Sequence, residues 1–485
     1  MAERRPDPKQ EPASDDAGGG LWRRLRLVLA LTLVGVLVTV TAVLATGLMT
    51  GQGSPSVGAS PPSATPSVAA GVPSAPLGAS ARPLIAVVDE QGALATMDEL
   101  GGTVVSYAVP GVVLGFPAWS PDGSRIAAVG YGPDDTSIYV FTVQRGGGGN
   151  TDPVVIYRSP DRPPFYLYWA PDSRMLAFLA TEPAGISLRI APADGSAPLD
   201  GSSPGSVIRR GAPLYFAWEG ADRLLLHVGS GSGAFVGEVG LDGTAVAPTI
   251  PGSGNFRSAS VSRDGLFLAY VRSVTDSSGE IVVASRDGAS RRNLAVFGPA
   301  AFVFDPTGDT MASIAADKPV KDALAFPLGP LRLIDARSGS IRTLLDGSVI
   351  AFFWAPDGRT IAALRVAQPT QKTADAGLVL SGATAAGPVE AATSPPGAEV
   401  RIAFVDVSTG VVRSEHVVRL ASTFVNELLP YFDQYALSHR LWSPDSASIL
   451  LPLVDATGRA RLVLVPTDGV DSPPIAGGVS GFWSP

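Results

Sequence analysis

Short apolar runs recur along this chain, and a polar turn sequence precedes most of them. The turn is clearest as Trp-(Ser/Ala)-Pro-Asp-(Gly/Ser), which begins at Trp119, Trp169, Trp354 and Trp442. Proline fixes φ at the first corner of a type I turn, aspartate bonds the local backbone, and glycine accepts the left-handed position. The runs that follow, such as 125–129 (RIAAV), are continuously apolar. They therefore predict β-strands that are covered on both faces.

The turn sequence is a repeat. Looser copies begin at Trp218, Val261 and Phe304, and a truncated copy begins at Trp483. Along the first six copies the opening position advances by 50, 49, 43, 43 and 50 residues. A period in the forties with several short strands per unit is typical of a β-propeller with four-stranded antiparallel blades. We therefore predict an all-β propeller.

The repeated residues have two expected roles. The tryptophans should pack at equivalent sites between blades, and the aspartates should bond their own turns rather than hold calcium. These repeat residues are Trp119, Asp122, Trp169, Asp172, Trp218, Trp354, Asp357, Trp442, Asp445 and Trp483.

Both ends of the repeat region contribute to the expected ring. The apolar runs at 83–88, 93–97 and 103–108 have no such turn ahead of them, and residues 478–484 supply a fourth strand for that unit. Closing the ring with strands from both ends removes exposed sheet edges. On this count we expect eight blades, with seven as the alternative.

Three segments precede the propeller region at 83–485. Residues 1–26 form a polar tail that we expect to be disordered and cytoplasmic, and 27–49 is an uncharged apolar stretch of 23 residues. That stretch is long enough for one transmembrane helix, and the arginines before it place the N-terminus in the cytoplasm. The alternative is a cleaved signal peptide. Residues 50–82 are rich in Ser, Pro, Ala and Gly, which is typical of a linker.

The Ser-Pro-Asp-Gly type of turn followed by an apolar strand resembles the TolB-like family of WD-repeat-like β-propellers. The copies that begin at 119, 354 and 442 match best, and the resemblance covers 83–485. It implies a propeller that is generally extracytoplasmic and that binds partners or accompanies another domain.

Composition narrows the chemistry. The chain contains no cysteine, which excludes a disulfide framework and a thiol nucleophile. It has three histidines, His227, His416 and His439, without metal-ligand spacing, so we expect no metal, cofactor or catalytic set. The net charge of −8 argues against a nucleic-acid partner.

Two segments interrupt the repeat. Residues 367–399 form a low-complexity insertion within one blade, and 421–439 has the apolar spacing of a helix that Pro430 should kink. One interpretation is a short helix that covers the entrance of the ring. The sharper hypothesis is an aromatic partner-binding surface, since four aromatic or acidic side chains and a histidine cluster there. Its residues are Tyr431, Phe432, Asp433, Tyr435 and His439.

These expectations combine into one functional hypothesis. The chain is predicted to be a single-pass protein of the cell membrane whose extracytoplasmic propeller is a non-enzymatic binding scaffold of the bacterial cell envelope. Its partner would be an envelope protein or polymer of unknown identity. One alternative is a hydrolase or lyase that acts on peptide or glycan in the central funnel. Another is an extracytoplasmic sensor that signals through a partner.

Overall fold

The computed structural model describes most of the chain from residue 82 to the end. The described ranges are 82–145, 152–197, 205–229, 233–246, 250–251, 259–275, 278–287, 289–319, 327–366, 398–469 and 472–485. The predicted tail, membrane span and nearly all of the predicted linker lie outside them, as does the insertion up to residue 397. Within these ranges no helix has both the length and the apolar character needed to cross a bilayer.

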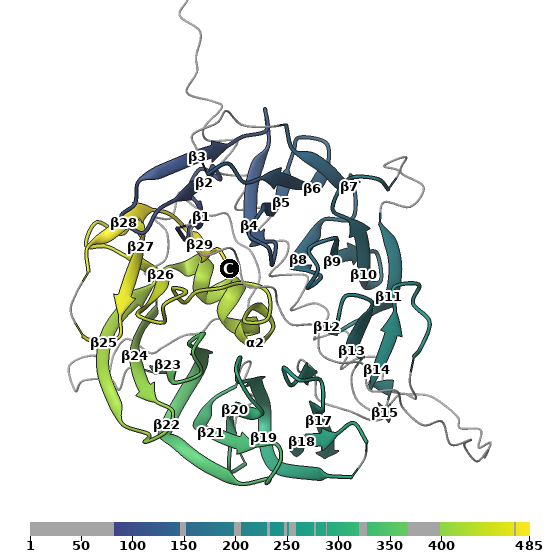
Figure 1. The fold of residues 1–485 in the computed structure, drawn as a ribbon, viewed down its shortest axis with the longest axis vertical. Helices are drawn as coiled ribbons and strands as arrows, with labels where there is room; N and C mark the ends of the chain where they lie inside the picture. The colour runs from purple at the N-terminus through teal and green to yellow at the C-terminus, as the bar shows by residue number, and fades with distance from the viewer. Residues whose placement is uncertain are drawn as a thin grey trace, which may run out of the picture.

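The described strands form antiparallel sheets that are arranged in a ring (Figure 1). The first sheet joins both ends of the described chain, with the order β29 (Ser480–Trp483), β1 (Ile85–Val88), β2 (Leu94–Met97) and β3 (Thr103–Tyr107). In it Ile85 lies opposite Trp483, so the ring closes with strands from the two ends as predicted.

Three further four-stranded sheets follow in chain order. The second sheet contains β4 (Val113–Trp119), β5 (Arg125–Tyr131), β6 (Thr136–Thr142) and β7 (Val154–Ser159). The third contains β8 (Pro164–Trp169), β9 (Met175–Glu182), β10 (Gly185–Pro192) and β11 (Ser206–Gly211). The fourth contains β12 (Leu214–Glu219), β13 (Arg223–Val228), β14 (Phe235–Gly240) and β15 (Ile250–Pro251).

The remaining strands are connected into one 13-stranded sheet. Its strands are β16 (Ser260–Val261), β17 (Phe267–Thr275), β18 (Ser278–Ser285), β19 (Arg291–Phe304), β20 (Thr310–Ala316), β21 (Gly329–Asp335), β22 (Ile341–Trp354), β23 (Thr360–Val366), β24 (Ala398–Asp406), β25 (Val412–Leu420), β26 (Ser448–Val454), β27 (Ala460–Pro466) and β28 (Pro474–Gly477).

Three irregularities divide this long sheet. The first half of β19 pairs with β18 and the second half pairs with β20, with a register shift between Phe297 and Ala300. β22 is shared in the same way between β21 and β23. β25 meets β26 at the single pair Leu420 and Leu453. The sheet is therefore a series of blade-like units rather than one continuous surface, and the all-β propeller prediction is confirmed.

The repeated tryptophans lie between neighbouring units. Five indole N–H groups donate to a backbone carbonyl of the preceding unit, at 2.9 to 3.1 Å. These donor and acceptor pairs are Trp119 with Phe482, Trp169 with Ala118, Trp218 with Tyr168, Trp354 with Val303 and Trp442 with Phe353. The corresponding indole N–H of Trp483 has no partner among the described residues.

The last position of the turn adds a second link between units. It is held in the left-handed region, with φ of 65° at Gly123 but also 63° at Ser173 and 61° at Ser446. The serine hydroxyls accept hydrogen bonds from the backbone N–H of Asp122 (3.1 Å) and Asp357 (3.2 Å) in the preceding units. The bond offsets the strain that a side chain incurs at a position suited to glycine.

The repeated aspartates bond the backbone of their own turns. Their side chains accept from the N–H two residues ahead, at 2.9 to 3.0 Å. The four that do so are Asp122, Asp172, Asp357 and Asp445.

Candidate functional site

The centre of the ring contains a helical segment rather than an open channel. The connection from β25 to β26 forms a π-helical turn, η2 (Phe424–Leu428), a 3-10 turn, η3 (Leu429–Tyr431), and a short α-helix, α2 (Phe432–Tyr435). Figure 1 shows α2 inside the ring of strands. We call residues 421–441 the central segment.

The central segment is not one regular helix, and its irregularity decides which side chains face inward. Pro430 lies in the 3-10 turn, where its missing N–H costs nothing, and Tyr431 leaves helical geometry with φ −126° and ψ 28°. The wide π turn and this break shift the helical register, so that Phe432 is fully buried while Tyr431 is only half-buried. The buried aromatic and aliphatic side chains are those of Phe424, Leu428, Phe432 and Tyr435.

The N-terminus of the segment has no side-chain cap. The Thr423 hydroxyl instead donates to the carbonyl of Val479 at 3.1 Å. This bond joins the segment to the residue just before β29.

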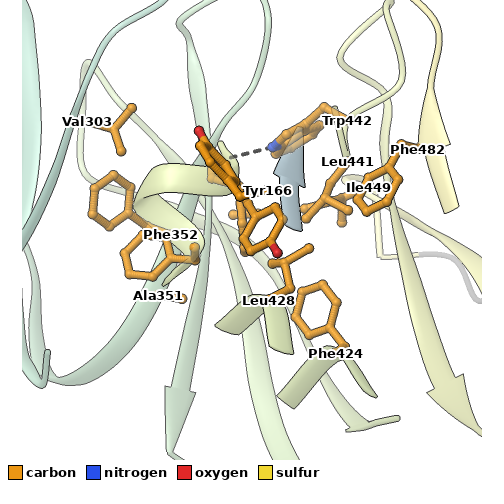
Figure 2. Packing of buried hydrophobic residues seen from close by; sticks show 14 of the residues in the cluster. Tyr166, Val303, Ala351, Phe352, Phe424, Leu428, Leu441, Trp442, Ile449 and Phe482 are labelled. Carbon is orange, nitrogen blue, oxygen red and sulfur yellow. Dashed lines mark hydrogen bonds between the residues drawn. The ribbon is translucent and has the colours of Figure 1, made fainter. Parts of the chain in front are cut away.

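Aromatic contacts connect the central segment to the inner strands of several units. The Phe432 ring lies 5.2 Å from that of Phe352 and 5.8 Å from that of Phe353, both in β22. On the other side Tyr435 meets Tyr166 of β8 edge-on at 5.3 Å. Figure 2 shows Tyr166 and Phe352 in the same packed cluster as side chains of the segment. Such edge-to-face pairs favour one fixed arrangement of the rings.

Gln434 fixes the segment by buried hydrogen bonds. Its side-chain amide donates to the hydroxyl of Tyr166 and to the carbonyl of Phe216, both at 2.8 Å. The Tyr166 hydroxyl in turn donates to the Gln434 carbonyl at 2.7 Å. Gln434 therefore joins the inner strands β8 and β12 of two neighbouring blades. Because these groups are buried, breaking one bond leaves its partner unsatisfied.

Two inner strands adopt strained backbone where they meet this segment. Phe116 (φ 52°) and Tyr166 (φ 49°) are non-glycine residues in the left-handed region, and each lies three residues before a repeat tryptophan. The register of β4 and of β8 shifts at these points. The Tyr166 hydroxyl bonds Gln434, and Phe116 lines a cavity beside the segment. Such strain persists only where surrounding contacts over-determine the conformation, and it is common at functional sites.

The cavity beside the segment is lined by a half-buried acid, Glu427. It has a volume of about 30 Å³ and is lined by Phe116, Glu427, Tyr435 and Phe482, among others. Burial raises the pKa of Glu427 to about 8, so its carboxyl is mostly neutral at pH 7. Burial also raises the pKa of Tyr435 and of Tyr131, and the nearby Glu427 adds to both shifts.

His439 is also neutral. Its Nδ1 lies 2.7 Å from the Ser438 hydroxyl, and its ring packs 4.6 Å from that of Phe482. Burial lowers its pKa to about 3.

The structure places the five predicted partner-binding residues together, but inside the ring. Phe432, Asp433, Tyr435 and His439 are buried, and Tyr431 is half-buried with its ring 6.4 Å from that of Tyr215. They do not form the exposed aromatic surface that the sequence predicted, because the segment turns inward to fill the ring. A partner could touch the four buried residues only if the segment moved, so partner binding here stays a prediction.

Sequence reasoning missed the residues that fix the segment. The helical spacing of 421–439 does not single out Gln434 or Glu427, and Tyr166 reads as an ordinary strand residue. No local pattern marks a left-handed tyrosine in a strand. Among the described residues, no group of three or more His, Cys, Asp or Glu side chains is arranged to hold a metal ion.

Comparisons with known proteins give structural likeness only. No protein-family model matches the chain, and no curated protein matches it. Among solved structures, it is similar to a putative TolB from Agrobacterium tumefaciens, with 19% identity, TM-score 0.33, and 57% of this chain and 96% of that chain covered. It is similar to TolB from Acinetobacter baumannii, with 13% identity, TM-score 0.35, and coverages of 77% and 66%.

A third match is a prolyl endopeptidase, with 11% identity and TM-score 0.47 over 76% of this chain. The chain spans only 50% of that enzyme's length. The matches include TolB structures, as the turn sequences suggest, and they are too distant to carry an activity to this chain.

Proposed function

We propose that this chain is a membrane-anchored, extracytoplasmic propeller of eight blades that serves as a non-enzymatic binding scaffold in the bacterial cell envelope. The blade count adds the four separate sheets to four units within the 13-stranded sheet, which is divided at β19, at β22 and between β25 and β26. The last of these units takes its innermost pairing from the bridge between Trp442 and Ile449.

The observation that supports binding over catalysis is the filled centre of the ring. A propeller enzyme of the alternative class would bind peptide or glycan in the central funnel. Here Phe432 and Gln434 occupy that region, joined to β22, β8 and β12 by ring contacts and by buried hydrogen bonds. Binding surfaces then remain on the faces and the outer rim, where loops and blade edges meet solvent.

The membrane placement rests on the sequence. The uncharged stretch at 27–49 is preceded by three arginines within 23–26 and followed by no charged residue before Arg82. That asymmetry places the propeller outside the cytoplasm. The Ser, Pro, Ala and Gly-rich stretch that follows would hold the ring away from the lipid surface.

The test is crosslinking and affinity capture of the full-length chain from its native membranes, with turnover assays on the same preparation. Binding-scaffold function predicts recovery of one envelope protein or polymer and no turnover of peptide or glycan substrates. Turnover together with no captured partner would reject this function. Protease treatment of intact and of opened cells checks the placement, because only an extracytoplasmic ring is cleaved in cells whose cytoplasmic membrane is intact.

A further inference from the structure

Neighbouring blades of a propeller separate toward the rim, and in two of the gaps an arginine side chain bridges the blades. Arg286, in the hairpin after β18, reaches back to Glu219 of the preceding blade at 2.8 Å. Arg337, in the hairpin after β21, bonds Asp264 of the preceding blade at 2.9 Å and also pairs with Asp309 of its own blade. In each of these two gaps the arginine is paired with carboxylates, so its charge is neutralised locally.

The hairpin after β24 is equivalent to those two but carries no arginine at either position. Arg286, Ala336 and Val407 occupy the same place, because each backbone N–H donates to the carbonyl just before the second strand of its own blade. The next residue, where the second hairpin has Arg337, is Ser408. Val407 and Ser408 line a cavity of about 450 Å³ in this gap.

Charged side chains line this cavity, which we call the rim pocket. It contains three guanidinium groups, of Arg342, Arg359 and Arg413, and two carboxylates, of Asp335 and Asp406. The arginines come from three different turns or strand ends of two neighbouring blades. The chain as a whole carries a net charge of −8, so this excess of cations is a local feature.

Both carboxylates are already engaged by their own hairpins. Hydrogen bonds from the Ser408 hydroxyl and neighbouring groups hold the pKa of Asp406 well below its usual range, and Arg413 pairs with it. Hydrogen bonds from Ser338 likewise lower the pKa of Asp335. Each therefore stays ionised, and neither neutralises the other two arginines directly.

The other two arginines, Arg342 and Arg359, can pair with an anionic ligand. Arg342 donates one bond to the Val407 carbonyl across the gap, which orients its guanidinium without neutralising it. Arg359 is exposed, and among the described residues its guanidinium has neither an ion pair nor a side-chain hydrogen bond. A planar guanidinium matches a carboxylate or a phosphate through two parallel hydrogen bonds.

We propose that the rim pocket binds a small molecule of roughly monosaccharide size that carries a carboxylate or phosphate group, with Arg359 as its main anchor and Arg342 as a second. The volume lies within the range of small-molecule sites. Polar side chains that can bond ligand hydroxyls line the same space. They are the hydroxyls of Thr310, Ser340 and Ser408 and the carboxylate of Asp335. This site is separate from the ring centre and does not depend on the membrane placement.

Calorimetric titration of the full-length chain in detergent at low salt tests the proposal. Galacturonate and glucose 6-phosphate are the two anionic probes, and galactose and glucose are their neutral counterparts. We expect saturable binding of at least one anion, weakened by added salt, and no binding of the neutral sugars. The anion that binds more tightly shows whether the pocket prefers a sugar acid or a sugar phosphate. Failure of both anions, or equal binding of a neutral sugar, would overturn the proposal.

A matched pair of variants locates the site. Arg174 follows the turn at Trp169 as Arg359 follows the turn at Trp354, and it too is exposed, but it does not line the pocket. Arg359→Gln should weaken binding about tenfold or more, the range expected for a lost charge-assisted pair, whereas Arg174→Gln should leave it unchanged. Melting temperatures confirm that both variants are folded. Equal affinities in the two variants would show that the anion binds elsewhere.

A second variant tests whether Arg342, rather than Arg359, contributes most of the binding. Arg342→Gln should also weaken binding, and the double variant with Arg359→Gln should abolish it. Retention of full affinity in the folded double variant would refute the site.

Discussion

Replacing Phe432 by alanine tests whether the central segment is packed into the ring as described. Phe432 has no exposed surface and contacts Phe352 and Phe353 edge-on. Removing a buried phenylalanine side chain costs about 3 to 5 kcal/mol, from lost burial plus the cavity that remains. The helical spacing of 421–439 alone does not decide whether Tyr431 or Phe432 is buried, so the two substitutions test the packing that the structure shows.

The structural assignment predicts a clear order of stability. Tyr431→Ala removes a half-buried ring and should cost about 1 kcal/mol or less, within the usual range for partly exposed positions. For a ring of about 400 residues the unfolding entropy is roughly 0.8 kcal/mol per degree, so Phe432→Ala should lower the melting temperature by about 4 to 6 °C. Tyr431→Ala should lower it by about 1 °C.

Scanning calorimetry of the full-length chain measures both variants beside the parent. Phe432→Leu serves as an intermediate, since it keeps most of the apolar volume and should recover much of the loss. If Tyr431→Ala proves as destabilising as Phe432→Ala, or more so, the inward packing of α2 is refuted.

Three further substitutions probe other parts of the ring. Ser173→Ala should lower the free energy of unfolding by about 1 to 2 kcal/mol, because it loses the hydrogen bond from the Asp122 N–H and keeps the left-handed backbone strain. Ser173→Gly should cost less, because glycine relieves that strain. Denaturation curves measure both variants, and equal costs would contradict the strain. Trp354→Phe should cost about 1 kcal/mol for the lost bond to the Val303 carbonyl, and an unchanged melting temperature would show that this bond contributes nothing. Glu427 has a pKa of about 8 in the folded chain against its ordinary value of 4.5, so its contribution to stability is fully present below pH 4.5 and is lost as pH rises toward 8. Glu427→Gln should therefore flatten the dependence of melting temperature on pH across this window, and a parallel pH profile in the variant would show that Glu427 is not buried.

The ring was predictable from the sequence because its signals are local and repeated. The four clearest turns combine a proline, an aspartate and a glycine or serine with fixed backbone preferences, and the apolar run after each is a strand. The closing pair of β29 and β1 was predictable for the same reason, since the last turn sequence lacks a strand and the first unit lacks a turn. Repetition compensates for the weakness of each single copy.

The interior of the ring was not predictable in the same way. Which face of 421–441 packs inward depends on the π turn at Phe424–Leu428, and the sequence gives no sign of it. The position of Gln434 depends on Tyr166 and Phe216, which are more than 200 residues away in sequence. The sequence shows that aromatic residues cluster in this segment. Whether such a cluster is buried or exposed depends on long-range contacts that no local pattern encodes.

The rim pocket was also invisible to sequence reasoning. It is lined by residues of two neighbouring blades that lie far apart in sequence, such as Asp335 and Asp406, and their proximity becomes clear only in the structure. Arg359 and Arg174 occupy the same place in their turn sequences, but only Arg359 lines the pocket.

Amide hydrogen exchange of the full-length chain tests most directly whether the ring centre is filled. Peptides that cover 424–435 should exchange as slowly as those from β22, because the segment is buried against that strand and bonded through Gln434. Exchange of 424–435 at the rate of an unprotected peptide, while β22 and β25 remain protected, would mean that the centre is open, and would return the central funnel to consideration as a site of catalysis.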